Sequence, residues 1–349
     1  MGNGEANTPA TSRVPPFPLP DSHFRIIVMG TGPFAVPMFE ALLASRHQVL
    51  LLVTKPRPAE HGRGGPPPNP MRAAAERHSV PVFDPESINT PEAQAELARH
   101  QPDVLVVADY GQILKPETLA VAPHGGVNLH GSLLPKYRGA APINWAIYHG
   151  DAETGVTVIQ MTPGIDAGPA LAIARTPIDA EEAAPALELR LSTLGAPLVV
   201  QVLDQLAAGT TSAVVQDPSL ASPARRLRNT DAVIDWQRTA LQIKNQVRAF
   251  EPWPRTLTFL HRKHGGEATR LILGRVAVAS APDAPIAPGS ILASGKNAAS
   301  GELELLVQTG EGALRIDSLQ PAGKRMMNIA EFLRGHPVEV GDRLGGESD

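Results

Sequence analysis

The sequence predicts an α/β protein, in which a Rossmann-like, doubly wound and mostly parallel sheet is followed by a small β-barrel domain. Three observations predict this fold class. Short apolar runs alternate with helical segments over residues 24–208, and this alternation is typical of a parallel sheet. Glycine, serine and proline are frequent in 209–228, which we interpret as a linker. Over 229–349, many short segments separated by turns indicate a small barrel.

The first domain opens with a strand, a glycine turn, a helix and a second strand. The apolar run 26–29 predicts the first strand, and Phe39, Leu42 and Leu43 have helical spacing. We expect further strands at 49–53, 80–83, 104–108, 127–130 and 156–161, and helices near 70–78, 91–100 and 185–208.

The glycine turn after the first strand fits a dinucleotide site poorly. The fingerprint needs a third glycine where Ala35 stands, and an acidic residue at the end of the second strand, where the sequence has Val53-Thr54-Lys55. A tight turn is the better interpretation.

A long insertion interrupts the first domain at 55–70, where prolines and glycines separate Lys55, Arg57, His61 and Arg63. A loop of this length inside a compact domain is usually functional or disordered. In the second domain we expect a helix at 237–250 and strands at 256–260, 269–279, 289–293, 302–308 and 313–319.

Composition narrows the class of protein. The chain has 349 residues, of which 42% are apolar, and its mean hydropathy of −0.09 is ordinary for a globular protein. No run approaches the roughly 20 apolar residues of a membrane helix. The absence of cysteine excludes disulfides and cysteine nucleophiles, and a reducing, cytoplasmic location is the simplest fit. Residues 1–23 are rich in proline, lack the pattern of a targeting signal and are expected to form a disordered tail.

Charge is distributed unevenly along the chain. The formal net charge is −4, yet residues 225–280 hold 11 basic side chains against four acidic ones. Such an excess suits the phosphate backbone of a nucleic acid, although a solvated surface of mixed charge would look the same. The 11 histidines are scattered without ligand spacing, so we expect no metal site.

The segment 126–168 carries the candidate chemistry. If 127–130 is a strand, its period of two places Asn128 and His130 on one face, at the end where open α/β sheets bind ligands. Asp166 returns in a later turn between glycines. Each residue alone has a plainer interpretation, as a buried structural histidine, a capping asparagine and a turn aspartate. Together they form a motif.

That motif resembles the folate-dependent formyltransferases. The likeness rests on Asn128, His130, the runs 132–135 and 138–142, and Gly164-Ile165-Asp166-Ala167-Gly168. The insertion and three later runs resemble the branch of the family that acts on charged initiator tRNA; these runs are Ile234-Asp235-Trp236, Arg248 to Pro254 and Ser318 to Arg325.

The resemblance implies a Rossmann-like domain that binds 10-formyltetrahydrofolate and an OB-like barrel that helps to hold the acceptor arm of initiator Met-tRNA. It implies that Asn128, His130 and Asp166 are catalytic, and that the folate is lined by Ser132, Leu133, Leu134 and Pro135. Contacts to tRNA are expected from Arg57 and Arg63 of the insertion and from Lys324 and Arg325 of the barrel.

Three departures from the family pattern affect contacts and leave the reaction intact. Gly65 and three prolines stand where the insertion of relatives carries lysines, Pro33 replaces a common acidic residue, and Asp109 replaces a small residue near the pterin pocket.

The expected reaction is attack of the methionine α-amine on the formyl carbon. The negative charge that develops on the formyl oxygen needs hydrogen-bond donors, which Asn128 and His130 could supply, while Asp166 could hold the imidazole and pass protons. A formyltransferase for an amino-sugar nucleotide is the main alternative; a formyl-folate hydrolase and a non-catalytic RNA-binding protein are others. The basic barrel favours tRNA, and we expect a monomer.

Overall fold

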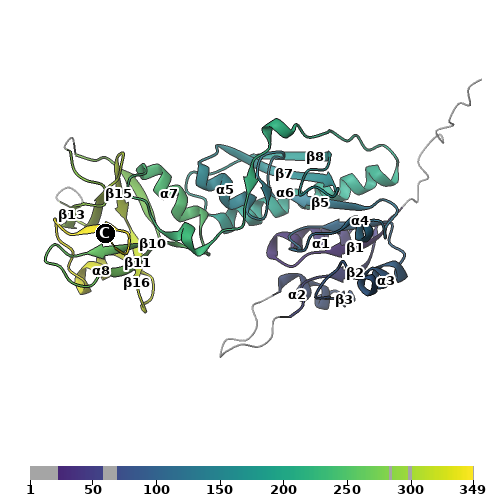
Figure 1. Cartoon of the computed structure of the whole chain (residues 1–349), viewed down its shortest axis with the longest axis horizontal. Coiled ribbons are helices and arrows are strands. Elements are labelled where there is room, and N and C mark those ends of the chain that lie inside the picture. The colour runs from purple at the N-terminus through teal and green to yellow at the C-terminus, as the bar shows by residue number, and fades with distance from the viewer. Residues whose placement is uncertain (1–22, 58–68, 283–284, 298–300, 349) are drawn as a thin grey trace, which may run out of the picture.

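The computed structural model describes residues 23–57, 69–282, 285–297 and 301–348, and it forms two lobes along one long axis (Figure 1). The larger lobe holds the sheet predicted for the first domain, and the smaller lobe holds the barrel. The predicted fold class is confirmed. The expected tail at 1–23 lies almost wholly outside the described residues, as does Arg63 of the insertion.

The larger lobe is built on a seven-stranded sheet of order β3-β2-β1-β4-β5-β7-β8. The first five of these strands are parallel, and β7 and β8 extend the sheet antiparallel. The strands are β1 (Arg25–Met29), β2 (Gln48–Val53), β3 (Val82–Phe83), β4 (Val104–Val107), β5 (Gly126–His130), β7 (Glu153–Gln160) and β8 (Ala170–Pro177). Strand order reverses between β1 and β4, and ligands of open α/β sheets bind in the crevice at such a point.

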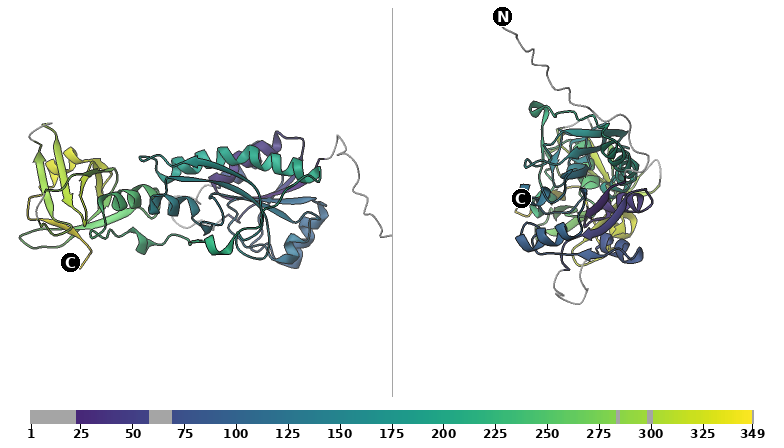
Figure 2. Two further views of the ribbon diagram at one scale, coloured as in Figure 1. Left: turned by 90° about the horizontal axis from the view of Figure 1, so that it is seen from above. Right: turned by 90° about the vertical axis from the view of Figure 1, so that its right-hand side faces the viewer.

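Alternation along the strands explains the two apolar layers. In β1, Ile26 and Val28 face one layer, whereas Ile27 and Met29 face the other, as the period of two requires. The first layer packs α1 (Val36–Leu43), α2 (Pro70–Arg77) and α6 (Ala184–Ala207) against the sheet. The second packs α3 (Pro91–Arg99) and α4 (Pro116–Leu119). Figure 2 shows the sheet between the long α6 and the helices of the opposite layer.

Helix α6 alone, among the described helices, is long and apolar enough to cross a membrane by length and composition. Its apolar residues have a different explanation in this fold. Leu187, Leu191, Val199 and Val202 are fully buried in the first layer. Gly195 lets the helix approach β5, because a Cβ there would lie 2.7 Å from a methyl group of Leu129. The helix therefore covers the strand that carries Asn128 and His130.

The smaller lobe closes into a barrel. Strands β11 and β12 are separated by Gly274, so the strand expected at 269–279 is two strands that belong to different sheets. The barrel closes where the edge strand of one sheet meets the edge strand of the other. There Ser290 pairs with Arg343, and the Leu344 amide donates to the Gly289 carbonyl at 2.7 Å. The elements are β10 (Thr256–His261), β11 (Thr269–Leu273), β12 (Val276–Ala279), β13 (Ile291–Lys296), β14 (Leu303–Gln308), β15 (Ala313–Ile316), β16 (Ser318–Pro321), β17 (Met327–Asn328), α8 (Ile329–Gly335) and β18 (Arg343–Gly345).

An aromatic junction joins the lobes. Helix α5 (Pro142–His149) of the larger lobe lies beside α7 (Ala240–Ala249), which begins at the Thr239 capping box rather than at residue 237. The rings of Tyr148 and Phe250 stack with centroids 5.3 Å apart, and the Arg238 guanidinium lies 4.5 Å from the Tyr148 ring centroid. Since α5 lies between His130 and Asp166 in the chain, the barrel is attached close to the candidate site.

Candidate active site

Strand β5 presents its two polar side chains as the sequence predicts. Val127 and Leu129 are buried in the apolar layer beneath α6, so Asn128 and His130 lie on the opposite face at the carboxyl end of the strand. Asn128 is half-buried, and within the described residues its side chain makes no hydrogen bond. A half-buried amide without a protein partner keeps its donors available to a ligand.

His130 is fixed through one ring nitrogen. The imidazole is 6% exposed, and Nε2 lies 2.9 Å from the backbone oxygen of Tyr137. Because a carbonyl oxygen only accepts, Nε2 must carry a hydrogen. The other nitrogen, Nδ1, is not held by this bond and lies on the side of Asp166.

Asp166 reaches that second nitrogen. Its Oδ2 lies 3.6 Å from Nδ1 of His130 and accepts a 2.8 Å hydrogen bond from the Gly139 amide. Sequence reasoning assigned the orientation of the imidazole to Asp166, whereas in the structure the Tyr137 carbonyl also holds the ring. The structure thus brings His130 and Asp166 together, with the carboxylate on the Nδ1 side of the imidazole.

The turn that carries Asp166 is tightly constrained. Asp166 has a φ of 48°, in the left-handed region that side chains other than glycine seldom adopt. Two residues later, a Cβ on Gly168 would lie 1.7 Å from the Gln160 carbonyl oxygen. Glycine is required at this position because the turn runs directly against β7.

The predicted folate-lining segment forms a folded loop beside the site. Thr157 of β7 is fully buried, its hydroxyl donates to the Ser132 carbonyl at 2.7 Å, and it accepts from the Leu134 amide at 3.1 Å. The Ser132 hydroxyl is itself engaged, because it donates to the Lys136 carbonyl at 2.7 Å. Thr157 and Tyr137 were missed by sequence reasoning; for Thr157, a threonine among the apolar residues of 156–161 was the available signal.

A hollow of about 480 Å³ opens on the outer side of this loop. Leu133, Leu134 and Pro135 line it, together with the ion pair of Lys136 and Asp151. None of Asn128, His130 and Asp166 lines this hollow. Three of the four predicted folate-lining residues therefore line this outer hollow, which the candidate catalytic residues do not reach.

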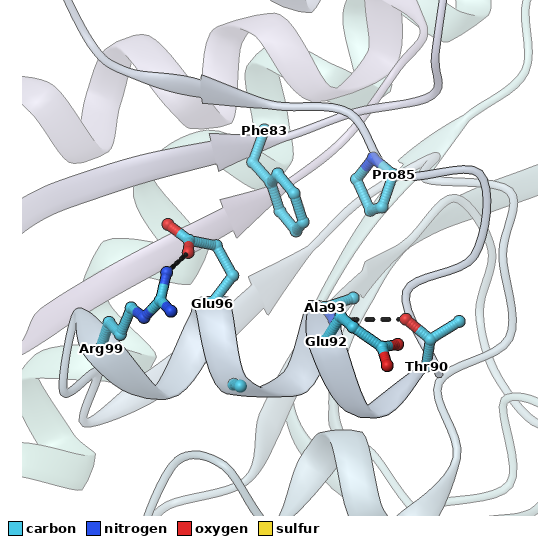
Figure 3. Close-up of a pocket in the computed structure, with 8 residues that line it drawn as sticks. Phe83, Pro85, Thr90, Glu92, Ala93, Glu96 and Arg99 are labelled. Atoms are coloured by element: carbon cyan, nitrogen blue, oxygen red, sulfur yellow. Dashed lines mark hydrogen bonds and ion pairs between the residues drawn. The ribbon is translucent and has the colours of Figure 1, made fainter.

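Another hollow, of about 500 Å³, lies at the far edge of the sheet (Figure 3). Phe83 and Pro85 cover it on one side, and residues of α3 line the other, where Glu96 and Arg99 form an ion pair at 2.6 Å. None of the predicted site residues lines this hollow, and two of its charged side chains, Glu96 and Arg99, pair with each other. We do not consider it a candidate active site.

Acidic groups adjoin the crevice between β1 and β4. Asp109 is exposed as a residue, yet its carboxyl group is crowded against Gly32, where a Cβ would lie 1.7 Å from Oδ2. The loss of solvent around this carboxyl raises its pKa, and the charge of Lys55 opposes the shift. Burial and the nearby charge of Asp109 raise the pKa of Glu188 on α6 to about 7.

The predicted tRNA contacts lie on both lobes. Arg57 is exposed and its guanidinium forms an ion pair with Glu76 at 3.1 Å. In the barrel, Arg325 is exposed and pairs with Glu331 at 3.1 Å, a contact that raises the pKa of the arginine. Lys324 is exposed, and its side chain makes no ion pair within the described part of the chain. Exposed ion pairs are weak, so both arginines can exchange their carboxylate for a phosphate.

No group of three or more histidine, aspartate or glutamate side chains within the described residues could hold a metal ion.

Two family models match the chain. Residues 24–203 match the formyl transferase model, and residues 226–337 match the model of the formyl transferase C-terminal domain. Residues 204–225, between the two matches, include most of the segment that joins the lobes.

Similar proteins fall into two groups. A methionyl-tRNA formyltransferase of Geobacter sulfurreducens is 42% identical over 92% of this chain and 96% of its own length. One of Methylococcus capsulatus is also 42% identical, over 92% of this chain and 99% of its own. Among solved structures, an N-formyltransferase of Helicobacter canadensis with folinic acid and dTDP-3-aminofucose has a TM-score of 0.61 at 18% identity, covering 84% of this chain and 98% of its own. The last comparison supports the fold alone.

Proposed function

This chain belongs to the formyl transferase family, and we propose that it transfers the formyl group of 10-formyltetrahydrofolate to the α-amine of methionine on initiator tRNA. The observation that carries this proposal is the extent of the likeness. Methionyl-tRNA formyltransferases match at 42% identity over 92% of the chain, barrel included. Such a transfer would supply formylmethionine for initiation of protein synthesis.

The folate supplies an activated formyl group, and the protein must stabilise the charge that develops on the formyl oxygen. Asn128 is suited to this, because its amide has no hydrogen-bond partner among the residues that the structure describes and shares a face with His130. Donors that are already in place when the charge forms contribute more than donors that must reorient. We assign Asn128 as the principal donor to this oxygen.

His130 and Asp166 are assigned to proton movement. The attacking amine loses a proton as its nitrogen bonds to the formyl carbon, and the folate nitrogen gains one as its bond to that carbon breaks. With Nε2 held by the Tyr137 carbonyl, the proton between Nδ1 and Asp166 is the one that can be exchanged. The pair takes a proton at one step and returns it at the other, so the reaction needs no net proton source.

The folate is assigned to the larger lobe, and the tRNA to surfaces of both lobes. We propose that Ser132 to Pro135 border the folate, and that the acceptor arm of tRNA contacts Arg57 and Arg63 of the insertion and Lys324 and Arg325 of the barrel. Support comes from the exposure of Arg57, Lys324 and Arg325, whereas Arg63 lies outside the described residues. Because these cations belong to different lobes, a ligand that contacts them all must span both. We further propose that the protein acts as a cytoplasmic monomer without a metal.

A substrate panel tests the assignment. Purified protein is incubated with 10-formyltetrahydrofolate and, separately, charged initiator tRNA, uncharged tRNA and a dTDP-amino sugar, and formylated products are identified by mass spectrometry. Formylmethionyl-tRNA should form, and His130→Ala should nearly abolish it. Formylation of the sugar with none of the charged tRNA would refute the proposed acceptor.

A further inference from the structure

The segment that connects the lobes is bonded to the catalytic loops along its length. Strand β9 (Pro223–Ala224) pairs in parallel with β6 (Arg138–Gly139). The Arg138 amide donates to the Ser222 carbonyl at 2.8 Å, and the Ala140 amide donates to the Ala224 carbonyl at 2.7 Å. Upstream, Val214 bridges to Ala170 just beyond the Asp166 turn. The connecting segment therefore touches both loops that surround His130.

Gln216 is the centre of these contacts. It is 7% exposed, and its Nε2 donates to the carbonyl oxygens of Asp166 at 2.8 Å and Gly168 at 2.7 Å. Its Oε1 accepts from the Arg138 guanidinium, from Nη2 at 2.7 Å and from Nε at 3.1 Å. The amide has one possible orientation, because carbonyls only accept and a guanidinium only donates.

The hydrogen bonds of Gln216 hold the backbone that positions Asp166 beside His130. The Asp166 backbone is in the left-handed region, and its carboxylate must reach the Gly139 amide while remaining 3.6 Å from Nδ1 of His130. One end of the Gln216 side chain holds the turn of Asp166, and the other end holds Arg138, the neighbour of Gly139. A single buried side chain thus sets the separation of the two loops that meet at His130.

We propose that Gln216 is a positioning residue for formyl transfer, which holds the Asp166 carboxylate within reach of His130 while contacting no substrate itself. This inference rests on the proposed function. Displacement of a catalytic group by about 1 Å can lower a rate about 100-fold, so loss of the amide should lower kcat far more than it raises either KM.

Two variants separate the ends of the side chain. Gln216→Met keeps the volume and removes every hydrogen bond. Gln216→Glu keeps an acceptor for Arg138 but cannot donate to the carbonyls of Asp166 and Gly168. If holding the Asp166 turn is the function, both variants should lose about 10- to 100-fold in kcat, with KM for the folate and for Met-tRNA within about threefold of wild type.

Gln246 provides a matched control in the smaller lobe. It is 2% exposed, its Nε2 donates to the carbonyls of Asp231 at 2.9 Å and Val233 at 3.2 Å, and its Oε1 accepts from Arg238 at 3.2 Å. Gln246→Met removes three buried side-chain hydrogen bonds away from His130, against four in Gln216→Met. It should lower the unfolding temperature about as much as Gln216→Met does, with kcat within about threefold of wild type.

The outcomes are distinct. An inactive wild-type protein would refute the proposed function, and crystal structures of wild type and Gln216→Glu would then decide the inference: Asp166 should leave ion-pair reach of His130 only in the variant. With active wild type, three results would overturn it: unchanged kcat in Gln216→Glu, an effect confined to KM, or an equal loss of kcat in Gln246→Met. Should Gln216→Met fail to fold, Gln216→Glu carries the same test.

Discussion

Replacing Asn128 by alanine removes a hydrogen-bond donor from the catalytic face and leaves the fold in place. The side chain is half-buried, and within the described residues it donates to no protein group. Truncation therefore leaves no buried partner unsatisfied, and the cost to stability should stay below about 1 kcal/mol. The effect on catalysis should be much larger, because loss of one oxyanion donor typically costs about 2.7–4 kcal/mol, or about 100- to 1,000-fold in kcat.

Steady-state formylation of Met-tRNA at saturating concentrations of both substrates measures this loss, and urea unfolding of the same samples measures stability. Asn128→Asp is a second variant of equal size that replaces the donor with an anion, and it should lose at least as much kcat as Asn128→Ala. A loss below about tenfold in Asn128→Ala would refute the assigned role. The assigned role would also be refuted if Asn128→Ala greatly lowered stability and kcat fell only in proportion to the loss of folded protein.

Three further predictions concern charge and packing. The pKa of Glu188 is raised to about 7. Its carboxyl group therefore contributes fully to stability below the usual pKa of 4.5, and this contribution is lost as pH rises through 7. Glu188→Gln should raise the thermal unfolding midpoint at pH 8 and leave it unchanged at pH 4. Lys324→Ala should weaken tRNA binding and reduce the slope of log affinity against log salt by about 1, and an unchanged slope in filter binding would exclude a phosphate contact. Gly195→Ala places a Cβ 2.7 Å from Leu129 and should destabilise the protein by about 1–3 kcal/mol, with chemical denaturation as the check.

Periodicity along the chain was sufficient to predict much of the fold. The alternation of Val127 and Leu129 with Asn128 and His130 placed the polar pair on one face, because a strand has only two faces. Boundaries that depend on single glycines were harder: Gly274 divides a predicted strand into β11 and β12, which pair with different partners. Nothing in a local pattern states where a strand changes sheet.

The catalytic geometry depended on contacts between distant parts of the chain. The approach of Asp166 to His130 was inferred from a family motif, since a separation of 36 positions along the chain gives no local signal of distance. No indication of a role for Gln216 came from the sequence, because the composition of its segment led us to interpret it as a linker. Its importance follows from hydrogen bonds to residues about 50 and 78 positions away, and a sequence pattern does not encode such pairings.

A competition assay distinguishes methionine on tRNA from an amino sugar as the formyl acceptor. Charged initiator tRNA and a dTDP-amino sugar are supplied together to the wild-type protein with limiting 10-formyltetrahydrofolate, and the two formylated products are counted from the same mixture. We expect nearly all of the formyl label on methionine, and we expect Asn128→Ala to slow its appearance about 100-fold or more. Label found chiefly on the sugar, or transfer to methionine that is unaffected in Asn128→Ala, would contradict these expectations.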